Sequence, residues 1–101
     1  MINPALAIPS ESLAALCRRR HIRRLAVFGS ALTERFGPDS DVDVLVEFAP
    51  GHTPGLAIID IEDELSALFG SRKVDLILRE DLSRWIRDRV LAEAEVLYAE
   101  G

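Results

Sequence analysis

Two aspartates, Asp41 and Asp43, lie two residues apart in a segment whose alternate residues are apolar. If the segment is a strand, both carboxylates project from one face, with their Cα atoms roughly 6.5 to 7 Å apart. A third carboxylate, Asp75, lies between core-type residues of a later segment and faces the same surface if the two strands are neighbours. Mg²⁺ prefers oxygen ligands and is usually held by one or two carboxylates together with substrate phosphates. The pattern therefore indicates a site for one or two metal ions of the kind that serves phosphoryl transfer.

Gly29 and Ser30 form a second candidate element, between an apolar segment and an expected short helix, and ten residues separate them from Asp41. Glycine allows close approach of the backbone to a ligand, and the N–H groups and the Ser30 hydroxyl would face an anion such as a triphosphate. Each part alone has a structural explanation, with Ser30 as a helix N-cap and the aspartates as solvated strand or turn residues. The combination of all the parts favours a site for phosphate and metal.

The spacing of apolar residues predicts the elements that position these side chains. Positions 42, 44, 46 and 48 are apolar, whereas Asp43 and Glu47 fall on the opposite face of the same strand. The β-α-β-α-β order predicts one α+β domain over residues 1–101, with a small mixed sheet of three strands or slightly more and helices packed on one face. The carboxylates would lie on the open face. The expected elements are a helix from a Ser10 cap to the basic stretch 18–20, a strand over 25–28, a brief helix over 30–36, a strand over 41–48, a helix from Ile58 to Gly70, a strand over 74–78 and a helical region opened by Asp81 that continues to Leu97.

Composition limits the classes of function. The 101 residues carry 12 Lys and Arg against 17 Asp and Glu, for a net charge of −5, which argues against strong nucleic-acid binding because that affinity comes mainly from cationic side chains. The one cysteine, Cys17, excludes a disulfide within the chain and a multi-cysteine zinc site. No apolar run is long enough to span a bilayer. These features predict a cytoplasmic protein without membrane contact.

The run Phe28-Gly29-Ser30, followed by Pro38-Asp39-Ser40-Asp41-Val42-Asp43, resembles the signature of the DNA polymerase β-like nucleotidyltransferases, and within them the minimal nucleotidyltransferases of prokaryotes. The resemblance implies a polymerase β-like palm fold and transfer of a nucleotide from a triphosphate with one or two Mg²⁺ ions. The residues that match the family's positions then have these implied roles: Asp41, Asp43 and Asp75 as catalytic metal ligands, and Gly29, Ser30, Ser40 and Arg35 as nucleotide-binding residues.

Many relatives of this kind act as antitoxins beside a HEPN-domain ribonuclease toxin, and the best-known branch transfers AMP from ATP to a tyrosine of that toxin. The resemblance therefore implies ATP as donor, a HEPN-type toxin as partner, and a homo-oligomer or hetero-oligomer. Two alternatives stay open. Many members carry basic residues and a glycine soon after Gly-Ser, where this chain reads Ala31-Leu32-Thr33-Glu34-Arg35, and this difference favours an antitoxin that neutralises its toxin by binding alone. The second is transfer to a small molecule such as an antibiotic, for which a chain of this size has little room to build a pocket.

Overall fold

The computed structural model describes residues 2–100 and has the predicted α+β class. A mixed four-stranded sheet in the order β3-β2-β1-β4 forms its centre. Strand β1 pairs antiparallel with β2 and β4, and β3 runs parallel to β2. The elements in chain order are α1 (Ser10–Arg19), β1 (Ile22–Phe28), the 3-10 turn η1 (Gly29–Leu32), β2 (Val42–Phe48), α2 (Ile58–Leu68), β3 (Val74–Leu78), the 3-10 turn η2 (Arg79–Asp81), α3 (Arg84–Glu93) and β4 (Glu95–Ala99).

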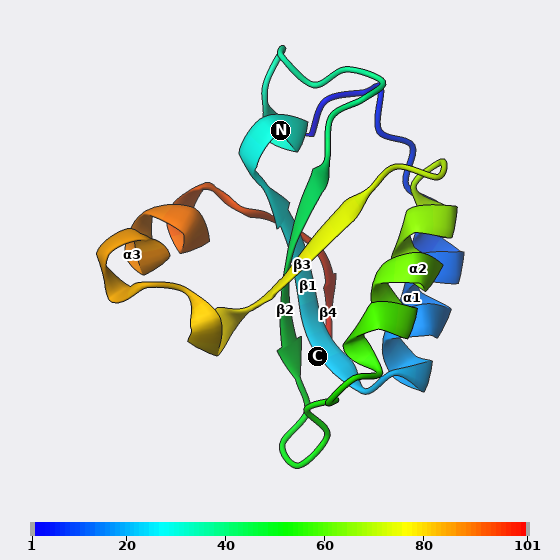
Figure 1. The fold of residues 1–101 in the computed structure, drawn as a ribbon, viewed down its shortest axis with the longest axis vertical. Coiled ribbons are helices and arrows are strands. Elements are labelled where there is room, and N and C mark those ends of the chain that lie inside the picture. The colour runs from blue at the N-terminus through cyan, green and yellow to red at the C-terminus, as the bar shows by residue number, and fades with distance from the viewer. Residues whose placement is uncertain (1, 101) are drawn as a thin grey trace.

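Two helices and one face of the sheet enclose the core. Helices α1 and α2 lie side by side on that face, whereas α3 lies on the opposite side (Figure 1). Strand β2 shows the predicted alternation, since Val42, Val44 and Val46 are fully buried while Asp43 and Glu47 on the other face are half-buried. Helices α1 and α2 contribute to the core the residues Leu13, Leu16, Cys17, Ile61 and Leu65. The prediction of helices on one face thus holds for α1 and α2, and α3 adds partial cover to the other face.

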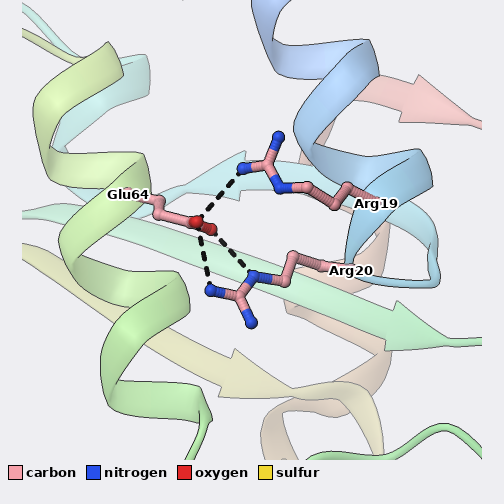
Figure 2. A network of polar contacts seen from close by, with 3 residues as sticks. All are labelled: Arg19, Arg20 and Glu64. Atoms are coloured by element: carbon pink, nitrogen blue, oxygen red, sulfur yellow. Dashed lines mark hydrogen bonds and ion pairs between the residues drawn. The ribbon is translucent and has the colours of Figure 1, made fainter.

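An ion-pair network joins the two core-facing helices away from their apolar stripe. Arg20 donates from Nε and Nη2 to the two carboxylate oxygens of Glu64, over 2.9 and 3.1 Å, and Arg19 donates to the same carboxylate over 3.1 Å (Figure 2). The hydrogen bond from Arg20 is the main cause that lowers the pKa of Glu64. A bidentate Arg–carboxylate pair has a defined geometry, so this network fixes how the end of α1 sits against α2.

The C-terminal segment differs most from the prediction. The expected helical region from Asp81 to Leu97 is in fact a 3-10 turn, the helix α3 and the strand β4, so the sheet has a fourth strand that periodicity did not indicate. The N-cap of α3 is Ser83, whose side chain accepts from the N–H of Trp85, and not Asp81. Among residues 2–100, no helix combines the length and the apolar character that crossing a bilayer requires.

Two expectations about helix starts are also corrected. Ser10 is the first residue of α1 and not its cap, because the N–H of Leu13 already bonds the carbonyl of Pro9 over 2.9 Å. The expected helix over 30–36 is only the short turn η1. Its continuation is replaced by side-chain bonds of Thr33, whose hydroxyl donates to the Ser30 carbonyl and accepts from the N–H of Arg35. Such local bonds offer the backbone an alternative to the helix.

Candidate active site

Asp43 and Asp75 lie opposite one another on neighbouring strands. Strands β2 and β3 are parallel, and their register makes Asp43 and Asp75 direct partners. Neighbouring strands lie about 4.8 Å apart, and side chains at paired positions share one face of the sheet. This face is the one turned away from α1 and α2, because the flanking residues Val42 and Val74 point into the core. The sequence expectation that the two carboxylates meet on one surface is therefore confirmed in position, and their roles stay a prediction.

Gly29 packs directly beneath the Asp43 carboxylate. Phe28 pairs with Asp43 across β1 and β2, so the turn that follows β1 begins at the level of this carboxylate. A Cβ on Gly29 would overlap Oδ2 of Asp43, and Gly29 also has φ +71°, in the left-handed region that favours glycine. Glycine is thus needed at this position for two independent reasons. The Gly-Ser turn and the Asp-x-Asp strand, separate signals in the sequence, form one structural unit.

Like charges surround the half-buried Asp43 carboxylate. Burial is the largest cause that raises the pKa of Asp43, and the negative charges of Asp75 and then Asp41 raise it further. Desolvation and neighbouring carboxylates both disfavour the ionised form. The site therefore has a negative potential that a cation would relieve.

Asp41 immediately precedes β2 and is held through its backbone. The hydroxyl of Ser30 donates to the carbonyl of Asp41 over 3.4 Å, and the N–H of Val42 donates to the carbonyl of Lys73 over 2.8 Å. The carboxylate of Asp41 lies 3.9 Å from Nζ of Lys73, with both side chains substantially exposed. Ser30 thus connects the Gly-Ser turn to the start of the acidic strand, as well as being a predicted nucleotide-binding residue.

The loop before Asp41 holds Ser40 in a structural role. The Ser40 hydroxyl accepts from the N–H of Gly37 over 3.0 Å, and the carbonyl of Gly37 accepts from the N–H of Ser40 and from Nη1 of Arg72, the latter over 2.5 Å. The Arg72 guanidinium also lies over the ring of Phe36, 4.3 Å from its centroid. Sequence reasoning did not single out Arg72, which precedes the third strand without any motif, although its contacts fix the loop that carries Asp41.

Arg35 lies apart from the cluster. It is exposed, its N–H donates to the Thr33 hydroxyl, and within residues 2–100 its guanidinium makes no hydrogen bond or ion pair. The structure thus brings together Gly29, Asp43 and Asp75, and Ser30 links this group to the backbone of Asp41, whose carboxylate faces Lys73. Ser40 is tied into the neighbouring loop, and the Arg35 guanidinium has no polar partner within residues 2–100. A mixed sheet that presents paired carboxylates beside a Gly-Ser turn is the arrangement of a nucleotidyl-transferring domain.

Comparison with known proteins agrees with this class. The model of the nucleotidyltransferase domain family matches residues 10–97. Protein adenylyltransferase MntA of Thermococcus cleftensis is 40% identical over 79 residues, 77% of this chain and 77% of that protein. A solved structure described as a minimal nucleotidyltransferase has a TM-score of 0.71 at 36% identity and covers 85% of this chain and 86% of that one. The MNT antitoxin in complex with tri-AMPylated HEPN toxin of Shewanella oneidensis shares the fold, with a TM-score of 0.64 at 20% identity over 89% of this chain and 69% of that one.

The chain belongs to the nucleotidyltransferase domain family, and its similarities place it among the minimal nucleotidyltransferases. The family generally uses a nucleoside triphosphate and a divalent metal ion. Among residues 2–100, no three His, Cys, Asp or Glu side chains converge on one point as a ready-made metal site, and Asp41 is turned toward Lys73. The donor set nevertheless fits a hard divalent cation, because all three candidate ligands are carboxylates and the half-buried Asp43 lies beside the negative charges of Asp75 and Asp41.

Proposed function

We propose that this protein transfers AMP from ATP to a hydroxyl of a partner protein, and that the partner is a HEPN-type toxin that the transfer neutralises. The single observation that carries the proposal is the pairing of Asp43 with Asp75 above Gly29. The names of the relatives add the acceptor class, since one is a protein adenylyltransferase and another is an antitoxin bound to an AMPylated HEPN toxin. The proposed activity belongs to the cytoplasm, which supplies the ATP.

The proposed roles divide the site into two parts. The backbone of Gly29 and Ser30 would lie along the phosphates, since successive N–H groups in a turn make an anion-binding concavity. Ser40 and Arg35 complete the proposed nucleotide-binding set, and Arg35 would have to turn its exposed side chain toward the phosphates. Asp41, Asp43 and Asp75 would hold Mg²⁺, as one or two ions, whose charge would offset that of the phosphates in the transition state.

The proposed reaction forms one bond and breaks another at the α-phosphorus of ATP. The acceptor oxygen bonds to this phosphorus, the bond to the β-phosphate oxygen breaks, and pyrophosphate leaves with the electron pair. The acceptor proton passes to a carboxylate, for which Asp75 is the candidate because it is exposed while Asp43 is half-buried. Phosphoryl transfer requires mainly positioning and charge stabilisation, so a site this small is sufficient for the chemistry.

Labelled ATP and a co-expressed HEPN-type partner test the proposal. The wild-type protein should transfer label to the partner, with an added AMP detected by mass spectrometry. Asp43→Ala should lower the rate by at least roughly 10²-fold, as expected for loss of an electrostatic element of the transition state. Asp63→Ala, at an exposed position on α2, is the matched control and should keep the wild-type rate. Retained transfer in Asp43→Ala would refute the assignment of the site.

Neutralisation by binding alone is the second candidate. Two observations favour it: the Asp41 carboxylate faces Lys73, and within residues 2–100 the Arg35 guanidinium has no polar contact. An Asp41→Ala, Asp43→Ala double variant distinguishes the two functions in cells that express the toxin. Loss of protection supports catalysis, whereas full protection by a variant that is folded and bound to the toxin supports binding.

A further inference from the structure

A cavity of about 210 Å³ lies on the same face of the sheet as Asp43, between the strands and α3. Its floor consists of Ala26, Leu45 and Val96, from the adjacent strands β1, β2 and β4, and its other wall consists of Leu91 of α3 and Ala94 just beyond it. This is the side of the sheet on which α3 stands in Figure 1. The floor and this wall are apolar, so this part of the cavity is suited to an apolar surface such as the face of an aromatic ring.

The cavity begins further along the strands from the paired carboxylates, which do not line it. Leu45 is the next residue after Asp43 that faces the same side of β2, which places the cavity floor roughly 6.5 to 7 Å further along the strand. Across the strand pair, Asp43 pairs with Phe28 and Leu45 with Ala26. This separation is close to what a ribose bridges between an α-phosphate and a base. A nucleotide with its phosphates at Gly29 and Asp43 can therefore extend into the cavity.

Three charged side chains at the edge of the cavity have no partner. Arg24, Glu47 and Arg79 line it, and within residues 2–100 none of them makes a hydrogen bond or ion pair. Arg24 and Glu47 are direct partners in the β1–β2 register, yet these oppositely charged side chains form no ion pair with each other. The edge thus offers both free donors and a free acceptor to a ligand that carries both kinds of group.

We propose that this cavity binds the base of the donor nucleotide, an inference that rests on the nucleotidyl transfer proposed above. An apolar cavity of about 150 Å³ is enough to bind benzene, so this one has room for an aromatic ring system. Adenine has ring nitrogens that accept from a guanidinium and an exocyclic amine that donates to a carboxylate. Glu47 accepts from the amine, and Arg24 or Arg79 donates to a ring nitrogen. If the cavity instead held the hydrocarbon part of an acceptor side chain, that group would use neither the Glu47 carboxylate nor the arginine donors.

Binding measurements with ATP and with tripolyphosphate, both with Mg²⁺, test the proposal by calorimetry. Wild-type protein should bind ATP about tenfold or more tightly than tripolyphosphate. Ala94→Leu, which fills the cavity from its half-buried wall, should weaken ATP binding about tenfold and leave tripolyphosphate binding unchanged. Ala92→Leu, at an exposed position of α3, is the matched control and should bind both ligands as wild type does. Thermal unfolding identifies any variant that has lost its fold.

Glu47→Gln gives a second measurement that does not depend on filling the cavity. Wild-type protein should bind ATP more tightly than inosine triphosphate, which has a carbonyl in place of the amine. The difference between the two affinities should be smaller in Glu47→Gln. Equal binding of ATP and tripolyphosphate, unchanged in Ala94→Leu, would overturn the base site and leave the phosphate site intact. If Ala94→Leu binds ATP as wild type does but has a raised KM for the partner, the base site is also overturned, because the cavity would then hold the acceptor. If wild-type protein binds neither ligand, both this proposal and the proposed function fail.

Discussion

Replacement of Gly29 by alanine tests whether the Asp43 carboxylate must keep its position above the turn. Two effects should add in the stability of the variant. Gly29 and Gly51 both have positive φ, at +71° and +79°, but a Cβ at Gly51 meets nothing within 4 Å, whereas at Gly29 it overlaps the Asp43 carboxylate. Gly51→Ala therefore measures the backbone term alone, and Gly29→Ala measures the backbone term together with the overlap.

The backbone term should be small. A left-handed conformation costs a non-glycine residue roughly 1 to 2 kcal/mol, and about 0.4 to 1 kcal/mol of this is offset because alanine restricts the unfolded chain. Gly51→Ala should thus lower the free energy of unfolding by about 1 kcal/mol. Overpacking costs about 1 to 3 kcal/mol, so Gly29→Ala should cost about 2 to 4 kcal/mol unless the Asp43 side chain rotates away. Asp43→Ala in the Gly29→Ala background removes the overlap and should recover the difference.

Urea unfolding and transfer of labelled AMP measure the two consequences separately. If the carboxylate rotates, the stability loss approaches that of Gly51→Ala while the transfer rate falls by about 10²-fold, because a displacement of about 1 Å near the reacting atoms has an effect of that size. If it does not rotate, the extra destabilisation appears and disappears with Asp43→Ala. Gly29→Ala that is as stable as Gly51→Ala and as active as wild type would refute the reasoning.

The remaining predictions concern the scaffold. The Arg20 hydrogen bond lowers the pKa of Glu64, so the ion pair stabilises the fold above the unfolded pKa of about 4.3, and this stabilisation is lost as pH falls through the folded pKa. Near pH 6, urea unfolding of Glu64→Gln should show a free energy of unfolding lower than wild type by at most about 1 kcal/mol, and the difference should vanish in stronger acid. Glu93→Gln, at an exposed position, is the control. Burial raises the pKa of Cys17 to about 12, so a disulfide reagent should modify this thiol only at the rate of unfolding; rapid labelling of folded protein would contradict its place in the core.

Residue periodicity predicted most of the fold, and it failed where one apolar stripe crosses from a helix into a strand. Leu82, Ile86, Val90, Ala94 and Leu97 follow helical spacing, yet the helix ends at Glu93 and the last two of these residues lie beyond it. The local signal for a strand, Val96 and Tyr98 at alternate positions, is too short to compete with that stripe. Pairing with β1 decides the outcome: Ala26 with Val96 and Leu25 with Tyr98 are partners in the sheet. Such a tertiary contact cannot be seen in the local sequence.

The candidate site was predictable for the same reason that β2 was. Strict alternation fixes which residues of β2 share a face, and the parallel neighbour β3 places Asp75 on that face. The sequence could not show that the Gly29 backbone supports the Asp43 carboxylate, because this contact depends on the β1–β2 register. It also could not show that Arg72 holds the loop before Asp41, since a lone arginine carries no motif.

The different exposures of the paired carboxylates indicate where an acceptor must enter. Asp43 lies on the interior strand β2 and is half-buried, whereas Asp75 lies on the edge strand β3 and is exposed. The outer edge of β3 is not free for strand addition at this level, because the N–H of Leu76 already donates to the Glu62 carboxylate over 3.0 Å. A partner would therefore approach over the face of the sheet, beside Asp75, and not along its edge. Water exclusion around the reacting phosphate then has to come from that partner, which explains why an enzyme of this size can leave its acceptor side open.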